Sequence, residues 1–178
     1  PAMAIQKAGV RDIKLPVRIL QKDGAIQDTV ASISLEADVP AALKPSGINS
    51  FTAILNRYIQ EINPRVFPKL LGEVQALLKA TGARIEMSFP YYLEKTAPVS
   101  GTRSLMEYQL VFSGDSASEE EFVLTVKVPV TTLCPCSKEI SLEGAHNQRA
   151  EVTLKAKFRK MVWAEDLIGL IEQSATCE

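Results

Sequence analysis

Two stretches near the N-terminus alternate apolar and polar residues. Apolar side chains occupy every second position in residues 13–20 and again in residues 29–37. Successive side chains of a strand point to opposite faces of a sheet, so this alternation predicts two strands, each with one buried face. The pair Asp23-Gly24 lies between them and is typical of a tight turn. The pattern therefore predicts an antiparallel hairpin.

The spacing of apolar residues then changes to that of helices. They recur three or four positions apart in residues 51–62, behind the candidate capping residues Asn49 and Ser50. A second apolar face follows in residues 67–78, and Gly82 is a candidate helix stop. Two consecutive helices are expected.

Alternation returns in the second half of the chain. The expected strands are residues 85–91, 108–112, 122–130 and 152–158, and a last helix begins at residues 167–171. Two loops, Glu94 to Arg103 and Leu133 to Arg149, are expected to interrupt these strands. Strands of this kind on either side of two helices predict an α+β fold, in which helices pack on one face of an antiparallel sheet.

Composition narrows the class of partner. The 178 residues include 20 basic and 21 acidic side chains, for a net charge of −1. No block of like charge stands out, which argues against nucleic acid or an anionic membrane as a partner. No apolar run reaches the roughly 20 residues that span a bilayer. Three cysteines without a disulfide pattern favour the reducing cytoplasm, where we expect this protein to act.

One polar segment carries candidate metal ligands. Cys134, Cys136 and His146 follow a predicted strand, and thiolate sulfur and imidazole nitrogen are the ligands that zinc prefers. The single histidine reaches the same ion as the cysteines only if the loop folds back. A C-x-C pair or a lone histidine often has a purely structural role, so these residues alone support that role and metal binding about equally. Three donors are fewer than the four of a closed structural site, which favours an open catalytic ion.

The same segment resembles a known family of enzymes. The run Thr131-Thr132-Leu133-Cys134-Pro135-Cys136-Ser137-Lys138-Glu139-Ile140-Ser141, followed by Gly144-Ala145-His146-Asn147-Gln148-Arg149, is similar to the signature of the type IB GTP cyclohydrolases. Further matching stretches are residues 89–92, 95–101, 104–108, 129–131 and 163–168. The similarity covers nearly the whole chain, which makes it far more specific than a three-residue pattern.

The resemblance implies a fold, an assembly and a reaction. Such enzymes have the bimodular tunnelling fold, so residues 1–130 would form the first module, and residues 131–178 the metal loop and the start of the second. Sheets of several subunits join into an oligomeric barrel with active sites at the interfaces, and we expect a homo-oligomer, a tetramer. The reaction implied is the hydrolysis of GTP to 7,8-dihydroneopterin triphosphate and formate, the first step of folate and pterin biosynthesis.

The resemblance also implies roles for individual residues. Cys134 and His146 would ligate a divalent metal, with Cys136 close to the ion. Zinc is the expected metal, and manganese and iron are the alternatives.

Cationic and hydroxyl groups beside the matched motifs are candidates to bind the GTP triphosphate. These candidates are Lys95, Ser100, Arg103, Lys138 and Arg149. For each of the four cations, a solvated surface charge is the competing interpretation, and a turn explains Ser100 equally well.

The chain departs from the family pattern at two places. Residues 45–51 read Pro-Ser-Gly-Ile-Asn-Ser-Phe where the family usually has Gly-Thr-His-Met-Ser-Arg-Phe. The family also continues beyond the position of Glu178 through a segment that supplies a metal-binding carboxylate. We therefore expect part of the site to come from beyond Glu178 and from a neighbouring subunit. Two alternatives stay open: a nitrile reductase of the same fold, with a cysteine nucleophile and a nicotinamide site, and a catalytically degenerate protein that binds purines or metal.

Overall fold

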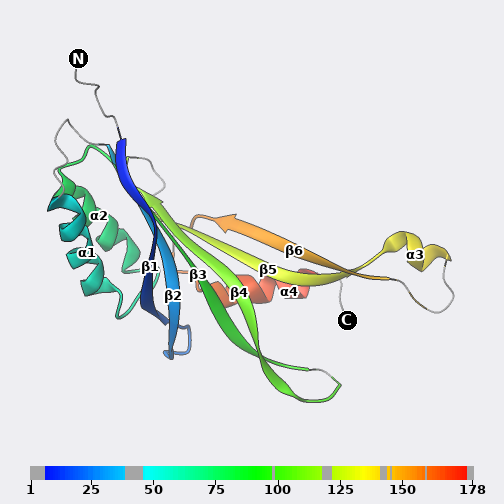
Figure 1. Cartoon of the computed structure of the whole chain (residues 1–178). Helices are drawn as coiled ribbons and strands as arrows, with labels where there is room; N and C mark the ends of the chain where they lie inside the picture. Colours follow the sequence, from blue (N-terminus) through cyan, green and yellow to red (C-terminus); the bar gives the residue numbers. More distant parts are fainter. Residues whose placement is uncertain are drawn as a thin grey trace.

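The computed structural model describes residues 7–38, 46–97, 99–117, 122–140, 144, 146–158 and 160–175. Within these ranges, the side chains of residues 7, 8, 46–50, 135 and 138 lie outside the description. The elements follow one another along the chain as Figure 1 shows. Their bounds are β1 (Lys7–Leu20), β2 (Ile26–Asp38), α1 (Ser46–Tyr58), α2 (Phe67–Leu78), β3 (Ala83–Thr96), β4 (Arg103–Asp115), β5 (Val123–Leu133), α3 (Pro135–Ile140), β6 (Asn147–Ala156) and α4 (Ala164–Ser174).

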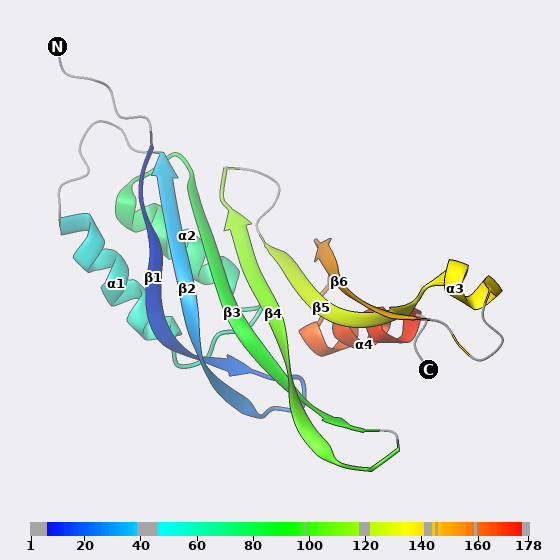
Figure 2. The same cartoon turned by 45° about the vertical axis from the view of Figure 1, so that its right-hand side comes forward.

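The described strands form one six-stranded sheet in the order β1-β2-β3-β4-β5-β6, and every neighbouring pair is antiparallel. Figure 2 shows the strands side by side in this sequence. The expected hairpin is present, because β1 pairs with β2 from Lys7↔Asp38 to Leu20↔Ile26 around the turn at Gly24. Consecutive strands pair with each other, including β2 and β3, although the chain between these two contains α1 and α2.

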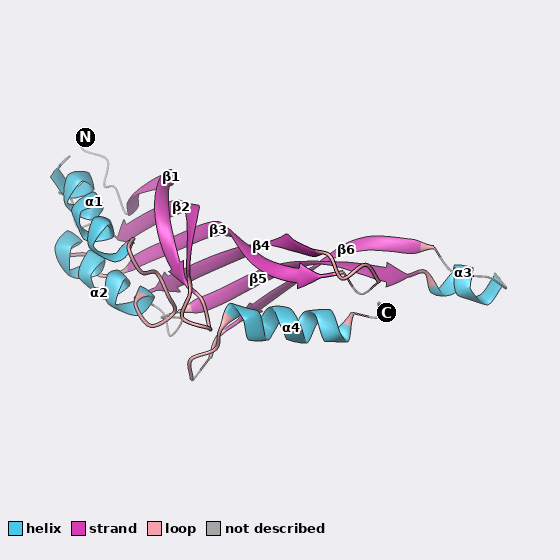
Figure 3. Ribbon diagram, turned by 90° about the horizontal axis from the view of Figure 1, so that it is seen from below, coloured by secondary structure: helices cyan, strands magenta, loops and turns pink. Residues whose placement is uncertain are grey.

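Helices cover one face of this sheet. Figure 3 shows α1 and α2 side by side at one end, and α4 along β5 at the other. Alternate strand residues, such as Ile33, Met87 and Phe112, form a single apolar core with residues of the three helices. On α2, the ring of Phe67 meets the ring of Phe112 edge-on, with 6.0 Å between centroids. The predicted α+β class, with helices on one face of an antiparallel sheet, is confirmed.

The strands are longer than the alternation predicted. β3 and β4 continue through most of the expected loop, up to the pair Thr96↔Arg103. β6 begins at Asn147, and α3 occupies part of what was expected to be an irregular loop. The first part of β6 is exposed on both faces, so apolar alternation marks only its second part, from Val152. Pairing of its backbone N–H and C=O groups with β5 is what extends these strands.

The residues predicted to cap the first helix and to end the second were wrong. α1 begins at Ser46, so Asn49 and Ser50 lie inside the helix, and it ends at Tyr58 because Ile62 instead bonds to the backbone of Arg18 on β1. α2 ends at Leu78, and the left-handed residue after it is Lys79, with φ 49°. Gly82 has another role, since a Cβ there would lie 2.7 Å from the side chain of Ala117.

The expected module boundary at residue 130 falls within β5. The division into modules, the tunnelling fold and the oligomeric barrel stay predictions. Within the described ranges, no helix is both long and apolar enough to cross a membrane.

Candidate functional site

The end of the β5–β6 hairpin brings the two predicted metal ligands together. Leu133↔Asn147 is the last pair of the ladder, and just beyond it the N–H of Cys134 donates to the carbonyl oxygen of His146 at 3.0 Å. Figure 1 shows this hairpin extending away from α1 and α2, with α3 at its tip. The chain therefore folds back between the cysteine and the histidine, as metal binding by both would require.

Hydrogen bonds around Cys134 favour its thiolate form. The hydroxyl of Ser137 is the main cause of a lowered pKa at Cys134, and the backbone N–H of Ser137 adds to it. A thiolate is the form of cysteine that binds metals, so this environment suits a ligand. Cys134 is half-buried, whereas Cys136 and His146 are exposed.

Ser137 also contacts the histidine segment. The backbone N–H of His146 donates to its hydroxyl oxygen at 3.4 Å. Ser137 is not among the candidate residues predicted from the sequence, although it lies inside the matched run. Ser137 is 9% exposed, whereas Cys136 and Glu139 on the same hairpin tip are exposed. This burial is a tertiary property that no sequence pattern signals.

The donor set suits a zinc-like ion but is incomplete. Cys134, Cys136 and His146 offer two sulfurs and one imidazole on one hairpin tip, which are the ligand types that zinc prefers. Across the described part of the chain, no three His, Cys, Asp or Glu side chains converge closely enough to hold an ion. The site therefore needs a further ligand or a rearrangement of these side chains.

The candidate substrate-binding residues divide between two hairpin tips. Lys95, Ser100 and Arg103 belong to the β3–β4 hairpin, whereas Lys138 and Arg149 belong to the β5–β6 hairpin with the cysteines. Figures 1 and 2 both show these two tips diverging from each other. Within one chain, the structure therefore does not bring the first three candidates to the cysteines.

Two of these cations are already paired with carboxylates. Lys95 Nζ lies 2.5 Å from Glu172 Oε2, and Arg103 pairs with Glu94.

The other three candidates differ in their surroundings. Ser100 donates to the hydroxyl of Thr102 at 3.0 Å, within the turn. Arg149 is exposed on β6 opposite Thr131. The side chain of Lys138 lies outside the described residues.

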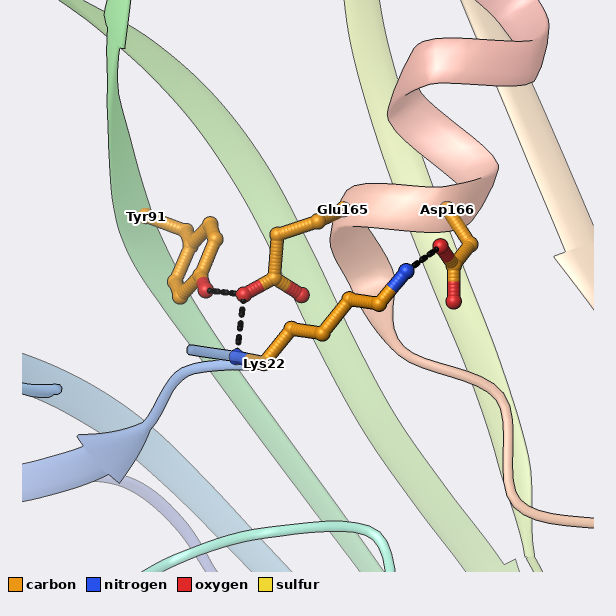
Figure 4. A network of polar contacts seen from close by, with 4 residues as sticks. All are labelled: Lys22, Tyr91, Glu165 and Asp166. Carbon is orange, nitrogen blue, oxygen red and sulfur yellow. Dashed lines mark hydrogen bonds and ion pairs between the residues drawn. The ribbon is translucent and has the colours of Figure 1, made fainter. Parts of the chain in front are cut away.

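A polar network that sequence analysis missed fastens the start of α4. Figure 4 shows Glu165 reaching both β3 and the β1–β2 turn. Its Oε1 accepts the hydroxyl of Tyr91 at 2.6 Å and the backbone N–H of Lys22 at 2.8 Å, while Lys22 Nζ pairs with Asp166. Burial, and then the bond to Glu165, raise the pKa of Tyr91. The phenol therefore stays protonated as a donor.

A second contact of the same kind holds the other end of α4. Tyr108, which pairs with Tyr91 across β3 and β4, donates its hydroxyl to Glu172. Lys95 joins this contact, because its ammonium group lies 5.8 Å from the centre of the Tyr108 ring as well as against Glu172. Two tyrosine–glutamate hydrogen bonds thus connect α4 to the sheet, and the glutamate of the second one, Glu172, also pairs with Lys95.

An open cleft of about 590 Å³ lies beside Glu165, between the β1–β2 turn and β3. Its polar groups serve the fold: the amide of Gln27 bonds both the N–H and the C=O of Tyr92, at 2.9 and 2.8 Å. The hairpin tip with Cys134 and His146 is therefore the better candidate for chemistry.

Comparison with known proteins identifies relatives over the whole chain. A family model described as type I GTP cyclohydrolase folE2 matches residues 1–178. The protein named GTP cyclohydrolase FolE2 of Syntrophus aciditrophicus is 49% identical over 98% of this chain and 69% of its own length. Proteins of that name from Pelobacter propionicus and Geobacter metallireducens are 43% and 44% identical, over 95% of this chain and 66% and 65% of their own lengths. The chain thus spans about two thirds of the length of these curated relatives.

Proposed function

Since the chain belongs to the type I GTP cyclohydrolase folE2 family, we propose that its protein hydrolyses GTP to 7,8-dihydroneopterin triphosphate and formate, as the first step of folate and pterin biosynthesis. Besides family membership, one structural observation supports this proposal: the backbones of Cys134 and His146 are hydrogen-bonded to each other at the end of the β5–β6 hairpin. The type IB assignment and the tunnelling fold are part of the same proposal. Family membership favours this reaction over that of a nitrile reductase.

In this proposal, Cys134 and His146 hold a divalent ion, with Cys136 beside it. Bound there, the ion would supply Lewis acidity and lower the pKa of a bound water. The protein contributes a thiol whose pKa is lowered by Ser137 and a backbone bond that keeps the two ligand residues adjacent. Zinc is the proposed metal because of the sulfur and nitrogen donors, with manganese and iron as alternatives.

The triphosphate of GTP needs cations, and those of one chain lie on two separate tips. We propose that a homo-oligomer, a tetramer, joins them, so that Lys95, Ser100 and Arg103 of one copy meet Cys134 and Arg149 of another. The divergence of the two hairpin tips supports this arrangement. Phosphate oxygens would replace the carboxylates that now pair with Lys95 and Arg103.

The test uses protein expressed from its complete coding region, stripped of metal and reloaded with Zn²⁺, Mn²⁺ or Fe²⁺. Incubation with GTP should yield a product that becomes a fluorescent pterin after oxidation and dephosphorylation. The variant Cys134→Ala should lose both the bound metal, by elemental analysis, and the product. Absence of product with all three metals would leave the catalytically degenerate alternative in place, and an unchanged metal content in Cys134→Ala would remove that residue from the site.

A further inference from the structure

Ser137 contacts both of the proposed metal ligands. Its hydroxyl oxygen accepts the backbone N–H of His146 at 3.4 Å. The same hydroxyl lies three residues after Cys134 in the chain and lowers the pKa of the Cys134 thiol. The direct bond from Cys134 N–H to His146 C=O, at 3.0 Å, is a second hydrogen bond that holds the His146 backbone at this place. Ser137 thus links the two ligand residues through its side chain.

The chemistry of a hydroxyl fits this position. A serine hydroxyl has one hydrogen to donate and two lone pairs to accept with. The N–H of His146 can only donate, so the hydroxyl accepts there and keeps its own hydrogen for the sulfur of Cys134. One hydroxyl can therefore restrain the thiol side chain and the histidine backbone at the same time.

The burial of Ser137 points to a specific role. It is 9% exposed, whereas Cys136, Glu139 and Ile140 on the same short helix are exposed. Serine is mostly a surface residue, and a buried hydroxyl is costly unless it is bonded. Among the described residues, no buried side-chain oxygen or nitrogen lacks a hydrogen-bond partner, so this cost is met by the contacts above.

We propose that Ser137 is a positioning residue of the metal site, whose hydroxyl holds the His146 backbone beside the Cys134 thiol so that sulfur and imidazole address one ion. This inference rests on the proposed metal site of Cys134 and His146. Groups that orient metal ligands in this way typically change metal affinity 10–100-fold when they are removed. A serine that only completed the turn of α3 would affect folding and leave the affinity of the folded protein unchanged.

The experiment measures Zn²⁺ affinity by competition with a chromophoric chelator, and the ligand field with Co²⁺. Ser137→Ala should bind Zn²⁺ at least about 10-fold more weakly and should shift the sulfur-to-cobalt absorption band. Ser137→Thr keeps the hydroxyl and should restore most of the affinity. Thr153→Ala, at an exposed position further along β6, is the control and should match the parent.

A matched pair covers the case in which Ser137→Ala does not fold. Ser137→Thr and Ser137→Val have nearly the same shape and differ in the hydroxyl, so valine should bind Zn²⁺ at least about 10-fold more weakly than threonine. Equal affinities for this pair would overturn the inference. Cys134→Ala distinguishes failure of the proposed metal site from failure of the proposed role of Ser137. If Cys134→Ala binds Zn²⁺ like the parent, the proposed metal site is wrong. If Cys134→Ala loses Zn²⁺ but Ser137→Val binds it with normal affinity, only the role of Ser137 is refuted.

Discussion

Replacing Tyr91 by phenylalanine removes one hydroxyl from a buried ring and tests how α4 is held. The hydroxyl donates to Glu165 at 2.6 Å, and the ring is 1% exposed. Hydrogen bonds to charged groups contribute about 1.5–3 kcal/mol. Glu165 is half-buried and keeps its bond from the N–H of Lys22, so solvent and this bond offset part of the loss. We expect Tyr91→Phe to lower the free energy of unfolding by about 1–2 kcal/mol.

The assay is urea unfolding followed by circular dichroism, with thermal melts beside it. For a domain of this size, each kcal/mol lowers Tm by about 2–4 °C, so the expected change is about 2–8 °C. The neighbouring Tyr92 is the matched control, because its hydroxyl meets Glu107 at an exposed position, at 3.1 Å. Tyr92→Phe should leave the urea midpoint essentially unchanged.

A double-mutant cycle assigns the effect to the bond. Glu165→Met removes the acceptor, so combining it with Tyr91→Phe should reveal a coupling within the roughly 0.5–3 kcal/mol seen for residues in contact. A coupling near zero, or equal midpoints for Tyr91→Phe and Tyr92→Phe, would refute the idea that this bond anchors α4.

Two further predictions concern alkaline stability and substrate binding. Burial, and then bonds to α4 carboxylates, raise the pKa values of Tyr91 and Tyr108. The folded protein therefore keeps phenol protons that the unfolded chain loses above about pH 10, and the free energy of unfolding should fall as pH rises past that value. The double variant Tyr91→Phe, Tyr108→Phe should show a smaller fall when urea unfolding is measured over the same pH range. An unchanged slope would contradict this account. Lys95→Met should raise KM for GTP by about 10-fold or more, as expected for the loss of one charged contact. Glu172→Gln keeps the lysine and should not raise KM. An unaltered KM in Lys95→Met would exclude this lysine from the phosphate site.

The positions of the main elements could be predicted because burial leaves a period in the sequence. The strand face that packs on the helices includes Ile33, Ile85 and Leu124, each 0% exposed, and such residues produced the alternation. Where the sheet extends beyond the core, as in the exposed first part of β6, side chains carry no period. Backbone pairing with β5 alone sets the strand there, so its start at Asn147 was missed.

The candidate ligands were also visible in the sequence, because sulfur and imidazole donors are defined by residue type and their spacing matched a family signature. The sequence places Cys134 and His146 in one segment, and the structure adds the hydrogen bond between their backbones at the end of the β5–β6 ladder.

Contacts between distant segments were decided by the tertiary structure. Tyr91 and Glu165 are 74 residues apart, and Lys95 and Glu172 are 77 apart. Hydrogen bonds of this kind require the donor–acceptor distance to be correct within a few tenths of an ångström, and only the packing of α4 on the sheet brings these groups together. The amino-acid sequence determines which residues can donate, accept or bind metal, because that is a property of each side chain. Which of them meet, as Ser137 does with Cys134 and His146, depends on how the β5–β6 hairpin closes, because closure alone sets the distances between them.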